Sequence, residues 1–194
     1  MQTALIRCRL LLATIIVCIN EQTGPGLYLA ARALFETTGL VACLLLHLRR
    51  YYANEESYDE FERVLRRLSL GQRWEPLRDA RGESLQPVNA LTLVESIATL
   101  LAEILGDPEA KKHTMASYEV LSEYCHPNRA GRRAGVRFSS DKLEATYEMA
   151  PRFSAEDIAA TLPAAGTVLL ALFAAHEESL RLLSTHEEMP TLER

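Results

Sequence analysis

The chain has 194 residues, of which 48% are hydrophobic and 24% are charged. This balance is typical of a folded globular protein and excludes a disordered or fibrous chain. The net charge of −5 excludes a protein that coats nucleic acid with its whole surface, but it is compatible with a local basic patch.

The first predicted helix covers about residues 4–20 and ends at the Gly and Pro residues of E21-Q-T-G-P-G26. Arg7 and Arg9 precede the apolar run L10-L-L-A-T-I-I-V-C-I19, as in a signal peptide. However, no small-x-small cleavage site follows, and the run is too short to span a bilayer core about 30 Å thick. We therefore expect a buried first helix and no membrane partner.

The four cysteines indicate the compartment. Cys8, Cys18 and Cys43 lie among apolar residues, and neither they nor Cys125 form the C-x-x-C spacing of a zinc or redox motif. Such cysteines are typical of reduced thiols packed as small hydrophobic residues. The sequence therefore predicts a cytoplasmic protein.

Two helices are predicted next. One covers about residues 27–53 and is apolar nearly all round, which is typical of the central helix of a bundle. The other begins at a capping box, in which the Ser57 hydroxyl and the Glu60 carboxylate each bond the other residue's backbone amide. Gly71 supplies its end.

A loop over about residues 72–86 leads to two further helices. The first opens at Pro87 or Asn89 and carries apolar residues at spacings of three and four. The second starts at D107-P-E109, where an N-cap carboxylate, a proline at the first position and an acid all favour a helix start. Pro127 ends it.

Alternating apolar and polar residues predict a small β-hairpin, inserted over about residues 136–149. A cap at Ser154 then starts a long final helix with a kink at Pro163, and residues 185–194 form a tail. The predicted fold is one all-α domain over residues 1–194. It is a helical bundle of about five to six helices with the hairpin before the last helix.

Three polar side chains form a stripe near the end of the fifth helix. Tyr118, Ser122 and His126 are spaced by four, so they share one face. The negative end of the helix dipole favours a protonated imidazole at His126. Either the stripe is a core tyrosine, a packing serine and a capping histidine, or it forms a small polar site together with Asn128.

An ion pair is predicted in the second helix, where Arg32 and Glu36 lie one turn apart in an otherwise apolar sequence. A partly buried pair is costly unless each member has further partners. The pair is therefore either self-contained at the bundle surface, or it reaches across to Tyr118, Ser122 or His126.

These two motifs together resemble a known group of proteins. The R-x-x-x-E of residues 32–36 and the Y-x-x-L-S-x-x-x-H-P-N of residues 118–128 are similar to motifs of uncharacterised all-helical bacterial proteins of unknown function. The resemblance covers mainly residues 27–50 and 115–131. It implies an intracellular helical bundle and brings no activity with it.

A cluster of arginines follows His126, formed by Arg129, Arg132, Arg133 and Arg137. Arginine forks match phosphate oxygens, so the cluster is either a phosphate or RNA site or a solvated loop. Separately, Arg181 and His186 are similar to the Arg and His of helical HEPN ribonucleases. That resemblance implies RNA cleavage by these two residues, usually at a dimer cleft.

The sequence contains no Walker A, dinucleotide-binding or G-x-S-x-G motif, and its histidines lack the H-E-x-x-H spacing. We therefore expect no cofactor and no metal. The leading hypothesis is a non-enzymatic binding module with a polar site at Arg32, Glu36 and His126. It would form a homodimer through an apolar helix face, such as residues 40–46 or 168–175.

The alternative is a metal-independent ribonuclease or an RNA-binding protein. The catalytic candidates would be His126 and Glu36, or else Arg181 and His186.

Overall fold

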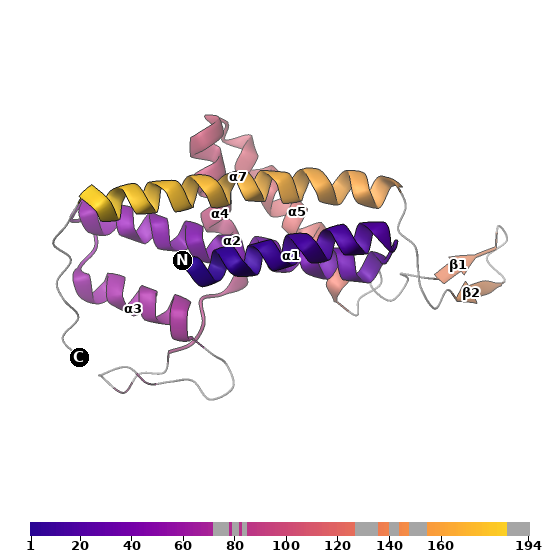
Figure 1. Cartoon of the computed structure of the whole chain (residues 1–194), viewed down its shortest axis with the longest axis horizontal. Coiled ribbons are helices and arrows are strands. Elements are labelled where there is room, and N and C mark those ends of the chain that lie inside the picture. Colours follow the sequence, from indigo (N-terminus) through magenta and orange to yellow (C-terminus); the bar gives the residue numbers. More distant parts are fainter. Residues whose placement is uncertain are drawn as a thin grey trace.

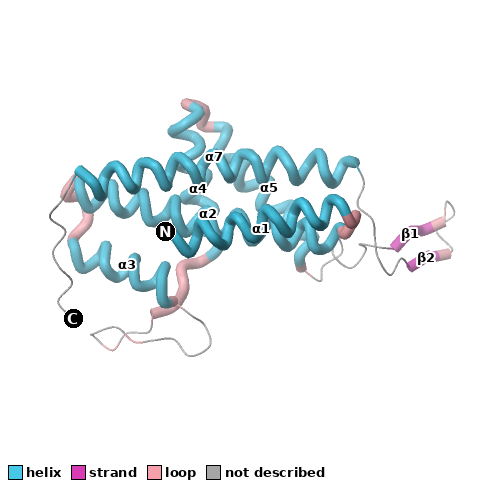
Figure 2. Tube along the Cα trace, viewed as in Figure 1, coloured by secondary structure: helices cyan, strands magenta, loops and turns pink. Residues whose placement is uncertain are grey.

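The computed structural model describes residues 1–71, 78, 82, 85–126, 136–139, 144–147 and 155–185. Over these residues the predicted all-α helical bundle is confirmed (Figures 1 and 2). The elements in chain order are α1 (Gln2–Asn20), α2 (Gly24–Tyr52), α3 (Tyr58–Leu70), α4 (Ala90–Leu105), α5 (Glu109–Cys125), β1 (Val136–Phe138), β2 (Ala145–Tyr147) and α7 (Ala155–Thr185).

Helix α2 is the central element, because it packs against α1, α3, α4, α5 and α7. Leu27, Leu34 and Leu45 on this helix are completely buried. Gly39 allows α4 to approach closely, since a Cβ atom there would lie 2.6 Å from the Cβ of Leu93. The helix begins earlier than predicted because Pro25 is tolerated in a first turn.

The apolar stretch 40–46, predicted as a docking face, lies mostly in this core. Val41, Ala42, Cys43 and Leu45 are buried. The apolar surplus of this stretch therefore stabilises the chain's own fold and leaves little surface for a partner. In the stretch 168–175 of α7, the side chains that stay exposed include Leu170 and Phe173.

The local signals at several helix ends are confirmed. The Ser57 and Glu60 capping box starts α3, and the Asn89 side chain accepts a hydrogen bond from the Leu91 amide at the start of α4. The Asp107 carboxylate accepts from the Glu109 amide at 2.9 Å. These contacts satisfy amides that have no partner within their own helix.

Two three-residue strands lie between α5 and α7. β1 pairs antiparallel with β2, with Val136 opposite Tyr147. Residues 140–143 and 148–149 of the predicted hairpin are outside the described residues, as are most of the loop 72–86 and the tail from residue 186. The hairpin as a packed insertion therefore stays a prediction. Helix α7 continues through Pro163.

Helix α1 is much less buried than predicted. Cys8, Ile15 and Cys18 pack on the core, whereas Leu10 is 63% exposed on the outer side. The expectation of a buried first helix is wrong for this outer side, because α2 is its main neighbour and covers one face only. By length and composition alone α1 and α2 could each cross a membrane, and 17% and 61% of their apolar stretches are buried.

Candidate functional site

Arg32 and Glu36 of α2 meet Tyr118 and His126 of α5, and we call these residues the Arg32 cluster. Arg32 Nε donates a hydrogen bond to Glu36 Oε1 at 3.0 Å. The Tyr118 hydroxyl donates to the same oxygen at 2.8 Å. The ion pair is therefore not self-contained, since Glu36 is bonded by both helices.

His126 closes the cluster at its exposed edge. It is the C-cap of α5 with an extended backbone (φ −93°, ψ 152°), as expected for a residue before proline. Its Nε2 lies 3.2 Å from Arg32 Nη1. A guanidinium only donates, so this contact is a hydrogen bond when Nε2 carries no proton.

Burial and neighbouring groups set the charges within the cluster. Burial opposes the charge on Arg32, but hydrogen bonds with Tyr118 and Glu36 outweigh it, so the pKa of Arg32 is raised. Burial and then the Glu36 carboxylate raise the pKa of Tyr118, although Arg32 acts in the opposite direction. The Tyr118 hydroxyl therefore keeps its proton and donates a hydrogen bond to Glu36. The guanidinium carbon of Arg32 also lies 5.7 Å from the centre of the Tyr118 ring, a cation–π distance.

Two further side chains of α5 border the cluster. Burial raises the pKa of the Cys125 thiol, while the nearby Arg32 acts in the opposite direction. A raised pKa favours the neutral thiol, which is a weaker nucleophile than the thiolate. The Ser122 hydroxyl is buried and has no hydrogen-bond partner among the residues that the structure describes. Of the predicted stripe, Tyr118 and His126 contact the charge pair through hydrogen bonds.

Most of the other predicted site residues lie outside the part of the chain that the structure describes. Asn128 and the first three arginines of the loop, Arg129, Arg132 and Arg133, are outside the described residues, as is His186. Arg137 belongs to β1, where its Cα lies opposite Thr146. Arg181 is an exposed residue of α7, and its Nη2 lies 3.9 Å from Glu178 Oε1. The resemblance to HEPN ribonucleases stays a prediction.

A stacked tyrosine pair beside the cluster was not predicted. The rings of Tyr28 and Tyr124 lie 4.3 Å apart and are nearly parallel, at 5°. They join the start of α2 to the end of α5, which holds the two halves of the cluster together. Its sequence signal is the spacing of four from Tyr28 to Arg32 and from Arg32 to Glu36.

A second ionic network lies away from the Arg32 cluster. Arg49 of α2 bonds both carboxylate oxygens of Glu178 on α7, at 2.9 Å and 2.5 Å. Its Nη1 donates to Glu103 of α4 at 2.6 Å. No sequence pattern links these residues, because they are distant in the chain and lie on three different helices. Arg49 therefore clamps α2, α4 and α7 together.

The part of the chain that the structure describes contains no group of three or more His, Cys, Asp or Glu side chains placed to hold a metal ion. The Arg32 cluster consists of a guanidinium and an imidazole at the exposed edge, next to a carboxylate bonded to a tyrosine hydroxyl. Comparison of the chain with protein-family models, curated proteins and solved structures finds no match.

Proposed function

We propose that this protein is a cytoplasmic helical binding module whose Arg32 cluster recognises an anionic oxygen group, such as a phosphate. The observation that carries the proposal is the 3.2 Å contact of Arg32 Nη1 with His126 Nε2 at the exposed edge of the cluster. This contact holds the two side chains next to each other at the edge that faces solvent. With Nε2 accepting from Arg32, the Nδ1–H group of the imidazole and the remaining Nη hydrogens of Arg32 can donate to a ligand.

Glu36 does not oppose such a ligand, because its charge is compensated. Arg32 Nε and the Tyr118 hydroxyl both bond its Oε1. These bonds also fix the guanidinium plane, so that the Nη end points to His126. A fixed guanidinium loses little freedom on binding and matches phosphate geometry. Glu36 and Tyr118 are therefore positioning residues for Arg32.

Titration of the full chain with inorganic phosphate tests this proposal. We expect His126→Ala and Arg32→Met to weaken phosphate affinity about tenfold each. Arg9→Met is the matched control, because it removes an equally charged and exposed side chain outside the proposed sites. The phosphate affinity of this variant should equal that of the wild type. His126→Ala is the cleaner variant, since Arg32→Met also removes a partner of Glu36. Equal affinities in all three variants would contradict the proposal.

A second candidate function is a metal-independent ribonuclease. The same Arg32 and His126 contact favours it, because RNA cleavage needs a proton acceptor and a cation that stabilises charge on the phosphorus. Glu36 is the other candidate base. Cleavage of an RNA oligonucleotide with a chelator present would be measured for His126→Ala and His186→Ala. If RNA is cut and both variants keep the wild-type rate, neither proposed site is catalytic.

The proposed partner of the module is a second copy of the chain, bound through the outer side of α1. This side carries Thr3, Ile6, Leu10, Ala13, Val17 and Asn20 at alternating spacings of three and four, and all six are exposed. That spacing is the seam of a two-helix coiled coil. A seam of this kind fits another helix.

The order of residues in this α1 seam favours antiparallel pairing. An antiparallel partner sets Leu10 of one copy against Ala13 of the other, a large residue against a small one, and Ile6 against Val17. Parallel pairing would instead place Arg9 beside Arg9 of the second copy, and the repulsion between these two positive charges disfavours that arrangement. The same helix face then forms both sides of a twofold dimer. One helix face is smaller than the roughly 800 Å² per partner of a standard interface, so we expect micromolar association.

A further inference from the structure

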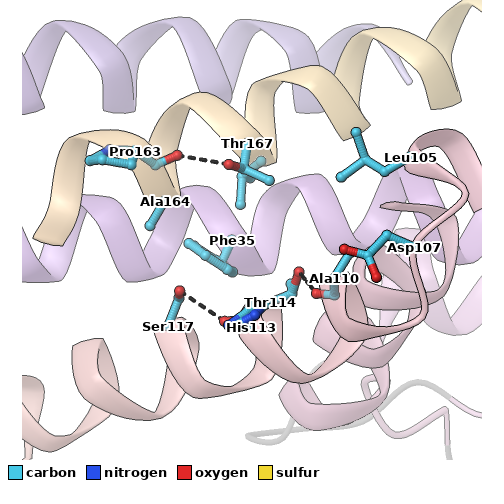
Figure 3. A pocket seen from close by; sticks show the side chains of 11 residues that line it. Phe35, Leu105, Asp107, Ala110, His113, Thr114, Ser117, Pro163, Ala164 and Thr167 are labelled. Carbon is cyan, nitrogen blue, oxygen red and sulfur yellow. Dashed lines mark hydrogen bonds between the residues drawn. The ribbon is translucent and has the colours of Figure 1, made fainter. Parts of the chain in front are cut away.

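A cleft of about 310 Å³ opens between α5 and α7 (Figure 3). The buried ring of Phe35 on α2 lines it, together with Ala110 of α5 and with Ala164 and Val168 of α7. The two alanines leave space that larger side chains would fill. This volume lies at the lower end of the range for small-molecule sites.

The hydroxyl groups that line this cleft already donate hydrogen bonds to backbone carbonyls. The Thr114 hydroxyl donates to the Ala110 carbonyl at 2.7 Å, and that of Ser117 donates to the His113 carbonyl at 2.9 Å. Across the cleft, the Thr167 hydroxyl donates to the Pro163 carbonyl at 2.9 Å. A hydroxyl has one proton and two lone pairs. Each of these oxygens therefore meets a ligand only as an acceptor.

The charged group of the lining is also an acceptor. Asp107 Oδ1 accepts from the Glu109 amide, and a carboxylate has about four acceptor positions, so most of its capacity remains. Among the side chains that line the cleft, the imidazole of His113 is the one that can still donate. An anionic ligand would meet lone pairs and a negative charge, so the lining disfavours it.

We propose that this cleft binds a small primary amine in its protonated form, with a hydrocarbon body. An ammonium group brings three donors and no acceptor, which complements the hydroxyl oxygens and Asp107. The hydrocarbon body would cover Phe35 and Val168 and remove their apolar surface from water. This preference is opposite to that of the Arg32 cluster, which presents donors to an anion.

The two sites share one structural neighbour. The Phe35 ring lines the cleft and lies 6.0 Å, centre to centre, from the Tyr118 ring of the Arg32 cluster. The amine site nevertheless uses none of the polar atoms of that cluster. Failure of phosphate binding and failure of amine binding would therefore be separate results.

Calorimetric titration of the full chain with hexylamine and with 1-hexanol at pH 7 tests the amine site. The two probes share a hydrocarbon chain and differ in the charged donor group. We expect hexylamine to bind at least about tenfold more tightly than hexanol. Equal affinity of the two probes would overturn the proposal.

Asp107→Asn supplies the decisive variant, because asparagine also caps helices and keeps nearly the same shape. Hexylamine affinity should fall about tenfold in it, while hexanol affinity stays the same. Glu119→Gln on the exposed side of α5 is the matched control, since it makes the same charge change outside the cleft. If Glu119→Gln weakens hexylamine as much as Asp107→Asn does, the amine responds to net charge and the site is refuted. Ala164→Met, which fills the cleft, should abolish binding of both probes.

Discussion

At the scale of single residues, the Tyr118 hydroxyl is the atom that ties α5 to the ion pair of α2. Tyr118→Phe removes this hydroxyl and keeps the ring on Phe35 and Arg32. We expect the free energy of unfolding to fall by about 1–2 kcal/mol, because Glu36 loses a donor in a half-buried site. Urea denaturation measures this change.

The control for this prediction is Tyr124→Phe on the same helix. Tyr124 is more exposed, and its contact with Tyr28 is a ring stack that phenylalanine preserves. Its stability should stay within about 0.5 kcal/mol of the wild type. If both variants lose the same free energy of unfolding, the hydrogen bond from Tyr118 to Glu36 does not contribute to stability as predicted.

Much of the Arg32 cluster can be predicted from spacing. Arg32 and Glu36 are one turn apart, and Tyr118 and His126 share a face, so each half follows from the helix repeat. The sequence does not show that the halves meet, because that depends on how α2 and α5 cross. The cleft at Phe35 is harder to predict from the sequence. Its serine and threonine residues resemble those of any helix, and only the structure shows that their hydroxyl groups donate to backbone carbonyls.

At the scale of the elements, two glycines inside helices predict opposite results for the same substitution. Alanine favours a helix over glycine by about 1 kcal/mol. At Gly39 the new methyl would lie within 2.8 Å of three Leu93 atoms, including the backbone carbonyl. We therefore expect Gly39→Ala to destabilise the fold by about 1–3 kcal/mol, measured by urea denaturation.

Gly166→Ala on α7 is its matched control, because a methyl group added there would meet no neighbouring atom within 4 Å among the described residues. This substitution should stabilise the protein by about 0.5–1 kcal/mol. A stabilising effect at both glycines would mean that α4 can move away from α2 at little cost.

The helix ends were predictable and the exposure of whole helices was not. The caps at Ser57 and Asn89 depend on residues close in the chain, so their local pattern is sufficient. The exposure of α1 depends on which helices cover it, and its composition is the same whether or not its outer side is covered. For this reason the sequence predicted a buried helix where Leu10 faces outward.

At the scale of the whole molecule, the Arg49 clamp makes stability depend on pH. Hydrogen bonds with Arg49 lower the pKa of Glu178 more than burial raises it. A carboxyl whose pKa is depressed in the folded state contributes stability above its unfolded pKa, near 4.3. That stability is lost as pH falls through the folded value. We expect the wild type to lose this contribution as pH falls below about 4.3.

Removal of Arg49 should weaken the dependence of the free energy of unfolding on pH in the acid range. Arg49→Met leaves Glu178 and Glu103 without their shared partner. We expect this variant to lose about 1–2 kcal/mol of stability at pH 7 and less at pH 3. Arg181→Met removes a weaker contact to the same carboxylate, at 3.9 Å, and should change stability little at either pH. Chemical denaturation at the two pH values distinguishes these outcomes. A pH-independent loss in Arg49→Met would assign its effect to packing.

The α1 seam predicts how the whole molecule associates. Leu10 lies at the middle of the proposed antiparallel contact, so Leu10→Glu places two carboxylates in a surface that must become apolar. We expect wild-type protein to sediment as a monomer and dimer mixture at micromolar concentration, and Leu10→Glu as a monomer. Leu91→Glu is the control, because it changes an exposed leucine of α4 and should leave the mixture unchanged.

The strongest competitor for the same face is a lipid surface, since α1 is apolar and carries Arg7 and Arg9 but no acid within its bounds. Sedimentation with anionic vesicles separates the two partners. Binding to vesicles by a wild type that is strictly monomeric in solution would contradict the dimer. We expect the protein to form a dimer and not to bind vesicles, because Cys8, Ile15 and Cys18 on the other side of α1 are buried in the core. A helix held in this way can present one narrow stripe, which matches another helix better than it matches a bilayer.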